Sequence, residues 1–132
     1  MSFLSISIEE ITKTDFRNYL LLRKDEIKWF SWHLGTHMKD FTAFNYCYKD
    51  KLVGIFCLKI EGKTLADIYI DKNYRRMGLG ELLVKKLNSK YPDLMFKVNP
   101  CNRNSIKFFE TILSKGIISR KDVNEDVYTY YS

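Results

Sequence analysis

Alternating apolar and polar positions along the chain predict a protein rich in β-strands. Two aromatic and β-branched runs are separated by Lys49-Asp50-Lys51, which indicates an antiparallel hairpin. A second turn at Glu61-Gly62-Lys63 leads into the next apolar run. Strands are therefore predicted over 3–8, 41–48, 52–59, 65–70, 94–98, 117–119 and 127–131.

Apolar residues at helical spacing predict four helices between these strands. In the segment 81–89 the leucines share one side, as in a helix that faces a core. Thr14 is expected to cap the first helix, and Gly35 is expected to end the second. The helices are predicted over 14–23, 25–34, 81–89 and 102–114.

The resulting order, β-α-α-β-β-β-α-β-α-β-β, predicts an α/β (α+β) fold in which helices pack on a mixed sheet. The chain has 132 residues and contains no linker rich in proline, glycine or serine. We therefore expect one domain over 1–132 with a core of its own, which buries roughly two-thirds of the unfolded surface.

The amino-acid composition limits the kinds of protein that this chain can be. The three cysteines are far apart and form no C-x-x-C pair, so neither a disulfide framework nor a zinc site is predicted. We expect reduced thiols and a cytoplasmic protein, without a signal peptide or a membrane partner, because no apolar run reaches the ~20 residues of a membrane span. The net charge of +6 favours an anionic cofactor or partner.

The most informative segment is the basic, glycine-containing loop Tyr74-Arg75-Arg76-Met77-Gly78-Leu79-Gly80-Glu81, which joins a predicted strand to a predicted helix. Unpaired N–H groups and the positive end of the macrodipole make such a helix start a site for phosphate. A P-loop is excluded because Glu81 and Leu82 follow Gly80. A dinucleotide fingerprint is excluded because Leu83 stands where the third glycine is needed.

The loop does fit the pattern [Q/R]-x-x-G-x-[G/A], and a second run, Asn102-Arg103-Asn104-Ser105-Ile106-Lys107-Phe108-Phe109-Glu110, follows one strand later. With both runs in this order, the chain resembles the GNAT superfamily of acyl-CoA-dependent N-acetyltransferases over about 41–116. The resemblance implies a mostly antiparallel sheet of about six or seven strands, with helices on both faces. It also implies a splay between the strands at 65–70 and 94–98.

The resemblance further implies that acetyl-CoA is the acyl donor. The loop residues Arg75 to Glu81 would hold the pyrophosphate, with one arginine directed toward the sheet and the other toward phosphate. Backbone groups of the preceding strand would bind the pantetheine arm, and the second run would contact the rest of the donor. The implied binding residues are Ile68, Tyr69, Ile70, Arg75, Arg76, Met77, Gly78, Leu79, Gly80, Glu81, Asn102, Ser105 and Lys107.

Two positions depart from the family pattern. Many relatives have a tyrosine acid at the position of Phe109, and some have a glutamate at the position of Lys97. Asp67 is the carboxylate that remains as a candidate general base, since an alkylamine must lose a proton before it attacks. The candidate acids are Tyr69, Tyr128, Tyr130 and Tyr131.

Three functions follow in decreasing order of support. The first is acetyl transfer to a primary amine, a small molecule or a peptide, by direct attack in a ternary complex. The second is an acyl-CoA-binding sensor of the same fold that has lost transfer, and the third is nucleic-acid binding. The resemblance places the acceptor pocket among the aromatic residues of 25–48, and it is compatible with a monomer or a homodimer. Metal is not predicted, because Gly35 separates His33 from His37 and no third ligand is evident.

Overall fold

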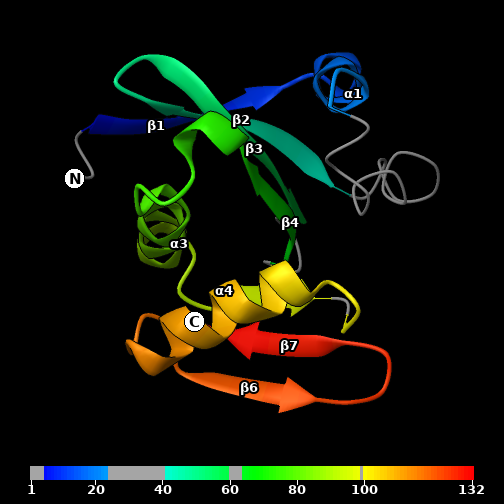
Figure 1. The fold of residues 1–132 in the computed structure, drawn as a ribbon, viewed down its shortest axis with the longest axis vertical. Helices are drawn as coiled ribbons and strands as arrows, with labels where there is room; N and C mark the ends of the chain where they lie inside the picture. The colour runs from blue at the N-terminus through cyan, green and yellow to red at the C-terminus, as the bar shows by residue number, and fades with distance from the viewer. Residues whose placement is uncertain (1–4, 24–40, 60–63, 99) are drawn as a thin grey trace.

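The computed structural model describes residues 5–23, 41–59, 64–98 and 100–132. Seven strands form one sheet in the order β1-β2-β3-β4-β5-β7-β6, with β1 at one edge and β6 at the other (Figure 1). All neighbouring strands are antiparallel except β4 and β5, which are parallel. The strands are β1 (Ile6–Ile11), β2 (Thr42–Tyr48), β3 (Lys51–Lys59), β4 (Thr64–Ile70), β5 (Met95–Val98), β6 (Arg120–Val123) and β7 (Tyr128–Tyr131).

The described helices agree with the predicted ones in order, apart from a short 3₁₀-helix that the sequence did not indicate. They are α1 (Lys13–Leu21), the 3₁₀-helix η3 (Lys72–Tyr74), α3 (Leu79–Lys90) and α4 (Arg103–Ser114). The predicted helix over 25–34 and the turn at 61–63 lie outside the described residues. None of the helices in the described ranges is long and apolar enough to cross a membrane.

Three local predictions were wrong. The first helix is capped by Thr12 rather than Thr14, because the Thr12 hydroxyl accepts a hydrogen bond from the Asp15 N–H at 3.0 Å. The first strand continues to Ile11, beyond its predicted end at residue 8, while residues 3 and 4 lie outside the described part of the chain. Residues 117–119 form a connection whose buried Ile118 packs in the core, and the strand β6 follows them with all four residues exposed.

Side chains alternate between two cores on opposite faces of the sheet. On one face α1 packs on Ala43, Ile55, Cys57 and Tyr69. On the other face α3 and α4 pack on a larger cluster that includes the stacked pair Phe44 and Phe56. Figure 1 shows α1 and α3 on either side of the strands β2 to β4. The prediction of helices on both faces is therefore confirmed.

The sheet opens between β4 and β5. Their ladder contains only two pairs, Thr64 with Met95 and Leu65 with Phe96. Beyond them β5 continues in register with β7, whereas β4 continues in register with β3 as far as Ile70. The two strands therefore part at their C-terminal ends, as predicted, and both ends lead directly into the segments that carry the two sequence motifs.

Candidate functional site

The turn after β4 is held by Asp71, which caps η3. Its carboxylate accepts a hydrogen bond from the Asn73 N–H at 3.1 Å, and its carbonyl accepts one from the Tyr74 N–H at 2.8 Å. The chain then passes through Arg76 and Gly78, which both have positive φ angles, of 65° and 75°. Glycine adopts this left-handed conformation without steric cost, so Gly78 allows the sharp entry into α3.

Helix α3 begins without a capping side chain. Its N-cap is Gly78, which makes no side-chain hydrogen bond to the first turn. The first main-chain bond of the helix runs from the Leu82 N–H to the Gly78 carbonyl at 3.0 Å. The preceding N–H groups, from Leu79 to Glu81, have no capping acceptor among the described residues, and the macrodipole makes this end positive. This arrangement is suited to an anion.

Two contacts fix the start of α3 against the sheet and against α4. The buried Tyr46 hydroxyl donates a hydrogen bond to the Leu79 carbonyl at 2.7 Å, and burial raises the pKa of Tyr46. A Cβ atom at Gly80 would lie 3.0 Å from the Phe108 ring. Gly80 therefore permits close contact between the two helices, so the two glycines of the loop have different functions.

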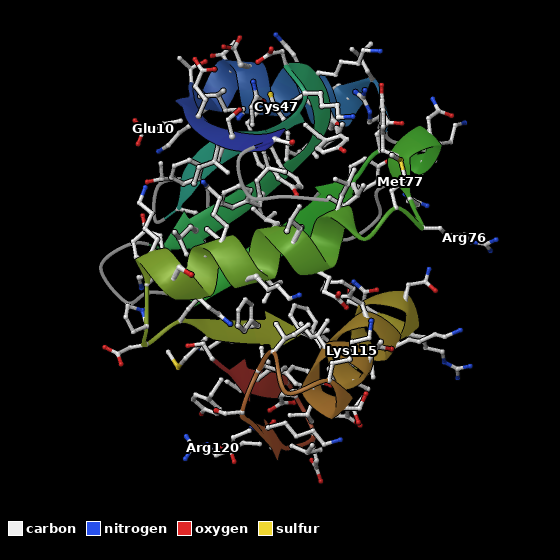
Figure 2. The ribbon with its side chains drawn as sticks, turned by 90° about the vertical axis from the view of Figure 1, so that its left-hand side faces the viewer. Glu10, Cys47, Arg76, Met77, Lys115 and Arg120 are labelled. Atoms are coloured by element: carbon white, nitrogen blue, oxygen red, sulfur yellow. The ribbon has the colours of Figure 1, made fainter. Side chains whose placement is uncertain are left out.

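The two arginines of the loop are also different. The Arg75 Nε donates to the Ile70 carbonyl at 3.0 Å, and the Arg75 guanidinium lies 5.2 Å from the centre of the Tyr69 ring. Figure 2 shows Arg76 pointing outward from the loop into solvent. The structure thus directs Arg75 toward the sheet and leaves Arg76 exposed, a choice that the sequence left open.

The acidic residue of the loop is paired with α4. Glu81 lies in the first turn of α3, where a carboxylate would compete with a bound anion. Its Oε1 accepts a hydrogen bond from the Lys115 Nζ at 2.8 Å, and Lys115 is the C-cap of α4. Met77, the remaining residue of the loop, is exposed. The Lys115 ammonium offsets the Glu81 charge in the first turn of α3.

The second motif begins at a conventional helix cap. The Asn102 Oδ1 accepts a hydrogen bond from the Ser105 N–H at 3.3 Å, so the side chain closes the first turn of α4. Ser105 is half-buried and Lys107 is exposed. These residues follow β5 at the same end of the sheet at which the loop follows β4, because the two strands are parallel.

Phe109, which stands where many relatives have a tyrosine acid, belongs to the core. It is 3% exposed and stacks on Tyr130 with ring centres 5.1 Å apart. The Tyr130 hydroxyl donates to the Glu110 carboxylate at 3.0 Å, and burial, with help from Glu110, raises the pKa of Tyr130. Both effects hold the proton on Tyr130, so this tyrosine is a poor candidate for the acid.

The remaining candidate residues lie on the strands β4, β5 and β7. The Asp67 backbone lies in β4 opposite Cys57, but its side chain lies outside the described part of the chain. Ile68 and Ile70 are half-buried, Tyr69 is buried, and Lys97 is exposed. Tyr128 and Tyr131 are half-buried on β7.

On the proposed acceptor side, Phe44 and Tyr46 are buried in the core. The aromatic residues and histidines between residues 25 and 40 lie outside the described part of the chain.

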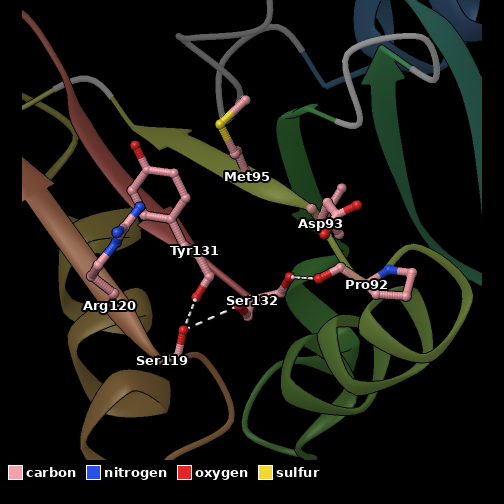
Figure 3. Close-up of a pocket in the computed structure, with 8 residues that line it drawn as sticks. Pro92, Asp93, Met95, Ser119, Arg120, Tyr131 and Ser132 are labelled. Carbon is pink, nitrogen blue, oxygen red and sulfur yellow. Dashed lines mark hydrogen bonds between the residues drawn. The ribbon is translucent and has the colours of Figure 1, made fainter.

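A pocket of about 370 Å³ lies elsewhere (Figure 3). The Ser132 hydroxyl donates to the Pro92 carbonyl at 2.6 Å, and the Ser119 hydroxyl donates to the Ser132 carbonyl at 3.1 Å. The pocket includes Met95, the first residue of β5, whereas the α3 and α4 motifs follow the last residues of β4 and β5. It is therefore separate from the loop of residues 74–81. The lining residues are Pro92, Asp93, Leu94, Met95, Ser119, Arg120, Tyr131 and Ser132.

Comparison with known proteins gives one family and one fold. The model of the Acetyltransferase (GNAT) family matches residues 6–113. An acetyltransferase from Thermus thermophilus superimposes with a TM-score of 0.66 at 19% identity, over 100% of this chain and 99% of that one. A GNAT family acetyltransferase from Elizabethkingia anophelis with acetyl-CoA bound gives 0.62 at 14% identity, over 96% and 97%.

The Campylobacter jejuni N-acetyltransferase PseH gives a TM-score of 0.59 at 17% identity, with 97% of both chains covered. At these identities the structural matches show a common fold. No curated protein matches the chain.

Proposed function

Because the chain belongs to the Acetyltransferase (GNAT) family, we propose that it transfers an acetyl group from acetyl-CoA to a primary amine by direct attack in a ternary complex. The observation that carries this proposal is the uncapped start of α3, which lies beside the point where β4 and β5 part. A similar structure was solved with acetyl-CoA bound, and another belongs to an N-acetyltransferase, which supports the choice of donor and of acceptor atom.

The residues of the loop fit the donor. Coenzyme A carries about four negative charges, and an uncapped helix start with positive φ at Gly78 lets phosphate oxygens approach the N–H groups of the first turn. Arg76 supplies an exposed positive charge, and Arg75 holds the loop to the end of β4. Backbone groups of Ile68 to Ile70 are the proposed partners of the pantetheine arm, and Asn102, Ser105 and Lys107 are proposed to contact the donor from α4.

When bound, acetyl-CoA supplies an activated acetyl group as a thioester. The uncharged amine nitrogen of the acceptor forms a bond to the acetyl carbon, the carbon–sulfur bond breaks, and the amine loses a proton. Asp67 is the proposed base for that proton, directly or through water. The coenzyme A thiol has a pKa near 8.5, so the thiolate can leave near neutral pH without a dedicated strong acid. It is protonated afterwards from solvent, directly or through a hydroxyl such as Tyr69 or Tyr131.

A second function is favoured by the surroundings of Phe109. The position that carries the acid in many relatives is filled by a buried ring that stacks on Tyr130 and lies 5.3 Å from the Phe96 ring centre. The exposed Lys97 likewise offers no carboxylate. A protein that binds acyl-CoA as a sensor and transfers nothing would tolerate both residues.

Two measurements separate these functions. Acetyl-CoA should raise the melting temperature, because a ligand that binds only the folded state stabilises it by mass action. Release of free thiol should then be followed with a panel of amines that includes an N-terminal peptide, lysine and a polyamine. A melting shift with turnover supports the enzyme, and a shift without turnover on any amine supports the sensor. No shift at millimolar acetyl-CoA contradicts both functions.

A further inference from the structure

Five side chains form a continuous set of contacts around the C-terminal end of β4. Two come from or follow α1, two belong to β4 and the residue after it, and one belongs to the phosphate-binding loop. We refer to Tyr19, Arg23, Tyr69, Asp71 and Arg75 as the β4-end cluster. The cluster links the α1 face of the sheet to the loop, which makes its members candidates for more than local stability.

Arg23 makes the largest number of these contacts. Its Nε and Nη2 atoms donate to the Asp71 Oδ2 at 3.4 and 3.2 Å, and its Nη1 donates to the Tyr19 carbonyl at 3.3 Å. Its guanidinium carbon lies 3.6 Å from the centre of the Tyr19 ring. The side chains of Arg23 and Asp71 are 25% and 17% exposed, so their ion pair is screened less than a pair on the open surface.

Asp71 connects Arg23 to the loop. One carboxylate oxygen accepts from Arg23, and the other accepts from the Asn73 N–H as the cap of η3. The Asp71 N–H donates to the Val53 carbonyl at 2.7 Å, which fixes the same residue to β3. A shift of the Asp71 carboxylate therefore changes the start of η3, and η3 leads directly to Arg75, Arg76 and Gly78.

A second connection runs through the aromatic rings. The Tyr19 ring meets the Tyr69 ring edge to face, with centres 6.3 Å apart, and the Arg75 guanidinium lies 5.2 Å from the Tyr69 centre. Arg75 also donates to the Ile70 carbonyl, the residue before Asp71. Arg23 and Arg75 thus hold the same end of β4, one from the end of α1 and the other from the loop.

We propose that Arg23 is a positioning residue for the acyl donor: through Asp71 it fixes the turn that presents Arg76 and the N–H groups of α3. The inference rests on the proposed function. The contacts of Arg23 go to Asp71 and Tyr19 rather than to the loop tip or the first turn of α3. Its main route to the donor therefore passes through Asp71 and η3, and the ring contact between Tyr19 and Tyr69 is a second route. A residue that only stabilises α1 should not change the affinity for acetyl-CoA.

The test compares dissociation constants for acetyl-CoA, measured by calorimetry well below the melting temperature. Arg23→Met keeps the aliphatic stem and removes the guanidinium, and we expect it to weaken binding about five- to tenfold. Asp71→Asn keeps an oxygen that can cap η3 and removes the charge, so it should weaken binding to the same extent. The double variant should be no weaker than either single variant, because both changes remove one interaction.

Two further variants separate positioning from stability. Arg17→Met removes an exposed arginine from α1 outside the cluster, and it should leave the affinity unchanged. Arg23→Lys keeps the charge without the planar fork and should recover part of the lost affinity. The inference is wrong if Arg23→Met lowers the melting temperature but binds acetyl-CoA as tightly as the wild type does. It is also wrong if the effects of Arg23→Met and Asp71→Asn on the affinity add. If the wild type itself does not bind acetyl-CoA, the proposed function fails and the inference fails with it.

Discussion

Helices α3 and α4 have the same length of 12 residues and pack into the same core, but they begin in opposite ways. The first turn of α4 is closed by Asn102, whose side chain accepts from the Ser105 N–H and whose carbonyl accepts from the Ile106 N–H at 3.0 Å. The first turn of α3 follows Gly78, in the left-handed region at φ 75°, and has no capping side chain.

The difference separates a helix start that is closed by its own side chain from one that is not. A capping side chain contributes about 0.5–2 kcal/mol to stability, and α3 does without this contribution. The same N–H groups remain directed at the space in front of the helix, where a phosphate can accept from them. Both helices follow strands that part at this end of the sheet, and the proposed phosphate site lies at the start of α3, which has no capping side chain.

The largest expected effect comes from placing a side chain at Gly78, at the start of α3. Gly78→Val should lower the affinity for acetyl-CoA by at least about 100-fold, because a β-branched side chain in the left-handed region costs about 1–2 kcal/mol and also obstructs the first turn. The measurement is the shift in melting temperature caused by acetyl-CoA, which should disappear.

Gly116 offers the matched control for this variant. It has the same φ of 75° just after α4, and a Cβ atom there would meet nothing within 4 Å. Gly78→Ala and Gly116→Ala should therefore lose similar stability, while only Gly78→Ala weakens acetyl-CoA binding. Equal binding by both alanine variants would show that the start of α3 is not the phosphate site.

A smaller effect is expected at the start of α4. Asn102→Ala removes the cap and should lower the free energy of unfolding by about 1 kcal/mol in denaturant titrations. Asn102→Asp keeps the acceptor oxygen, so its stability should match the wild type. If Asn102 also contacts the donor, the added negative charge should weaken acetyl-CoA binding about three- to tenfold. Unchanged affinity in Asn102→Asp would limit Asn102 to its capping function.

A loss of stability of about the same size is expected where α3 meets the sheet. Tyr46→Phe removes the hydrogen bond to the Leu79 carbonyl and should cost about 1 kcal/mol of stability at neutral pH. Burial raises the pKa of Tyr46 above the unfolded value of about 10, so its contribution is complete below that pH and is lost as the pH rises further.

Denaturant titrations at about pH 8 and pH 11, on either side of the unfolded pKa, check the Tyr46 prediction. The wild type should lose stability between them, and Tyr46→Phe should lose less. Tyr130, whose pKa is raised in the same direction, maintains the remaining slope in the variant. An identical loss in the two proteins would mean that the Tyr46 phenol is not held neutral by the fold.

The sequence predicted the position of the loop before α3 better than it predicted the contacts of each residue in the loop. The spacing of Arg75, Gly78 and Gly80 predicted a basic turn at the start of a helix, and the structure has one there, because the spacing of glycines and charges is a local property of the chain. The close approach of Gly80 to the Phe108 ring depends on packing between α3 and α4, which no local pattern gives. The hydrogen bond from Arg75 to the Ile70 carbonyl is local, but its direction depends on the turn through η3, which the sequence did not indicate.

The edge of the sheet shows the same limit. The apolar residues Ile117 and Ile118 predict a strand, but they fill the core in a connection, and the real strand β6 is wholly exposed. An exposed edge strand has no buried face and therefore no alternation to detect. Similarly, the contact between Arg23 and Asp71 joins residues 48 positions apart, which a pattern of local spacing does not reveal.

The central claim is that a phosphate group binds the uncapped start of α3. It is tested most directly by following backbone amide resonances during a titration with acetyl-CoA. We predict the largest shifts at the N–H groups of Leu79, Gly80 and Glu81, with much smaller shifts at Ser105, whose N–H already bonds to Asn102. Saturating acetyl-CoA that leaves the α3 amides unchanged, or that shifts Ser105 more than Gly80, would contradict the claim.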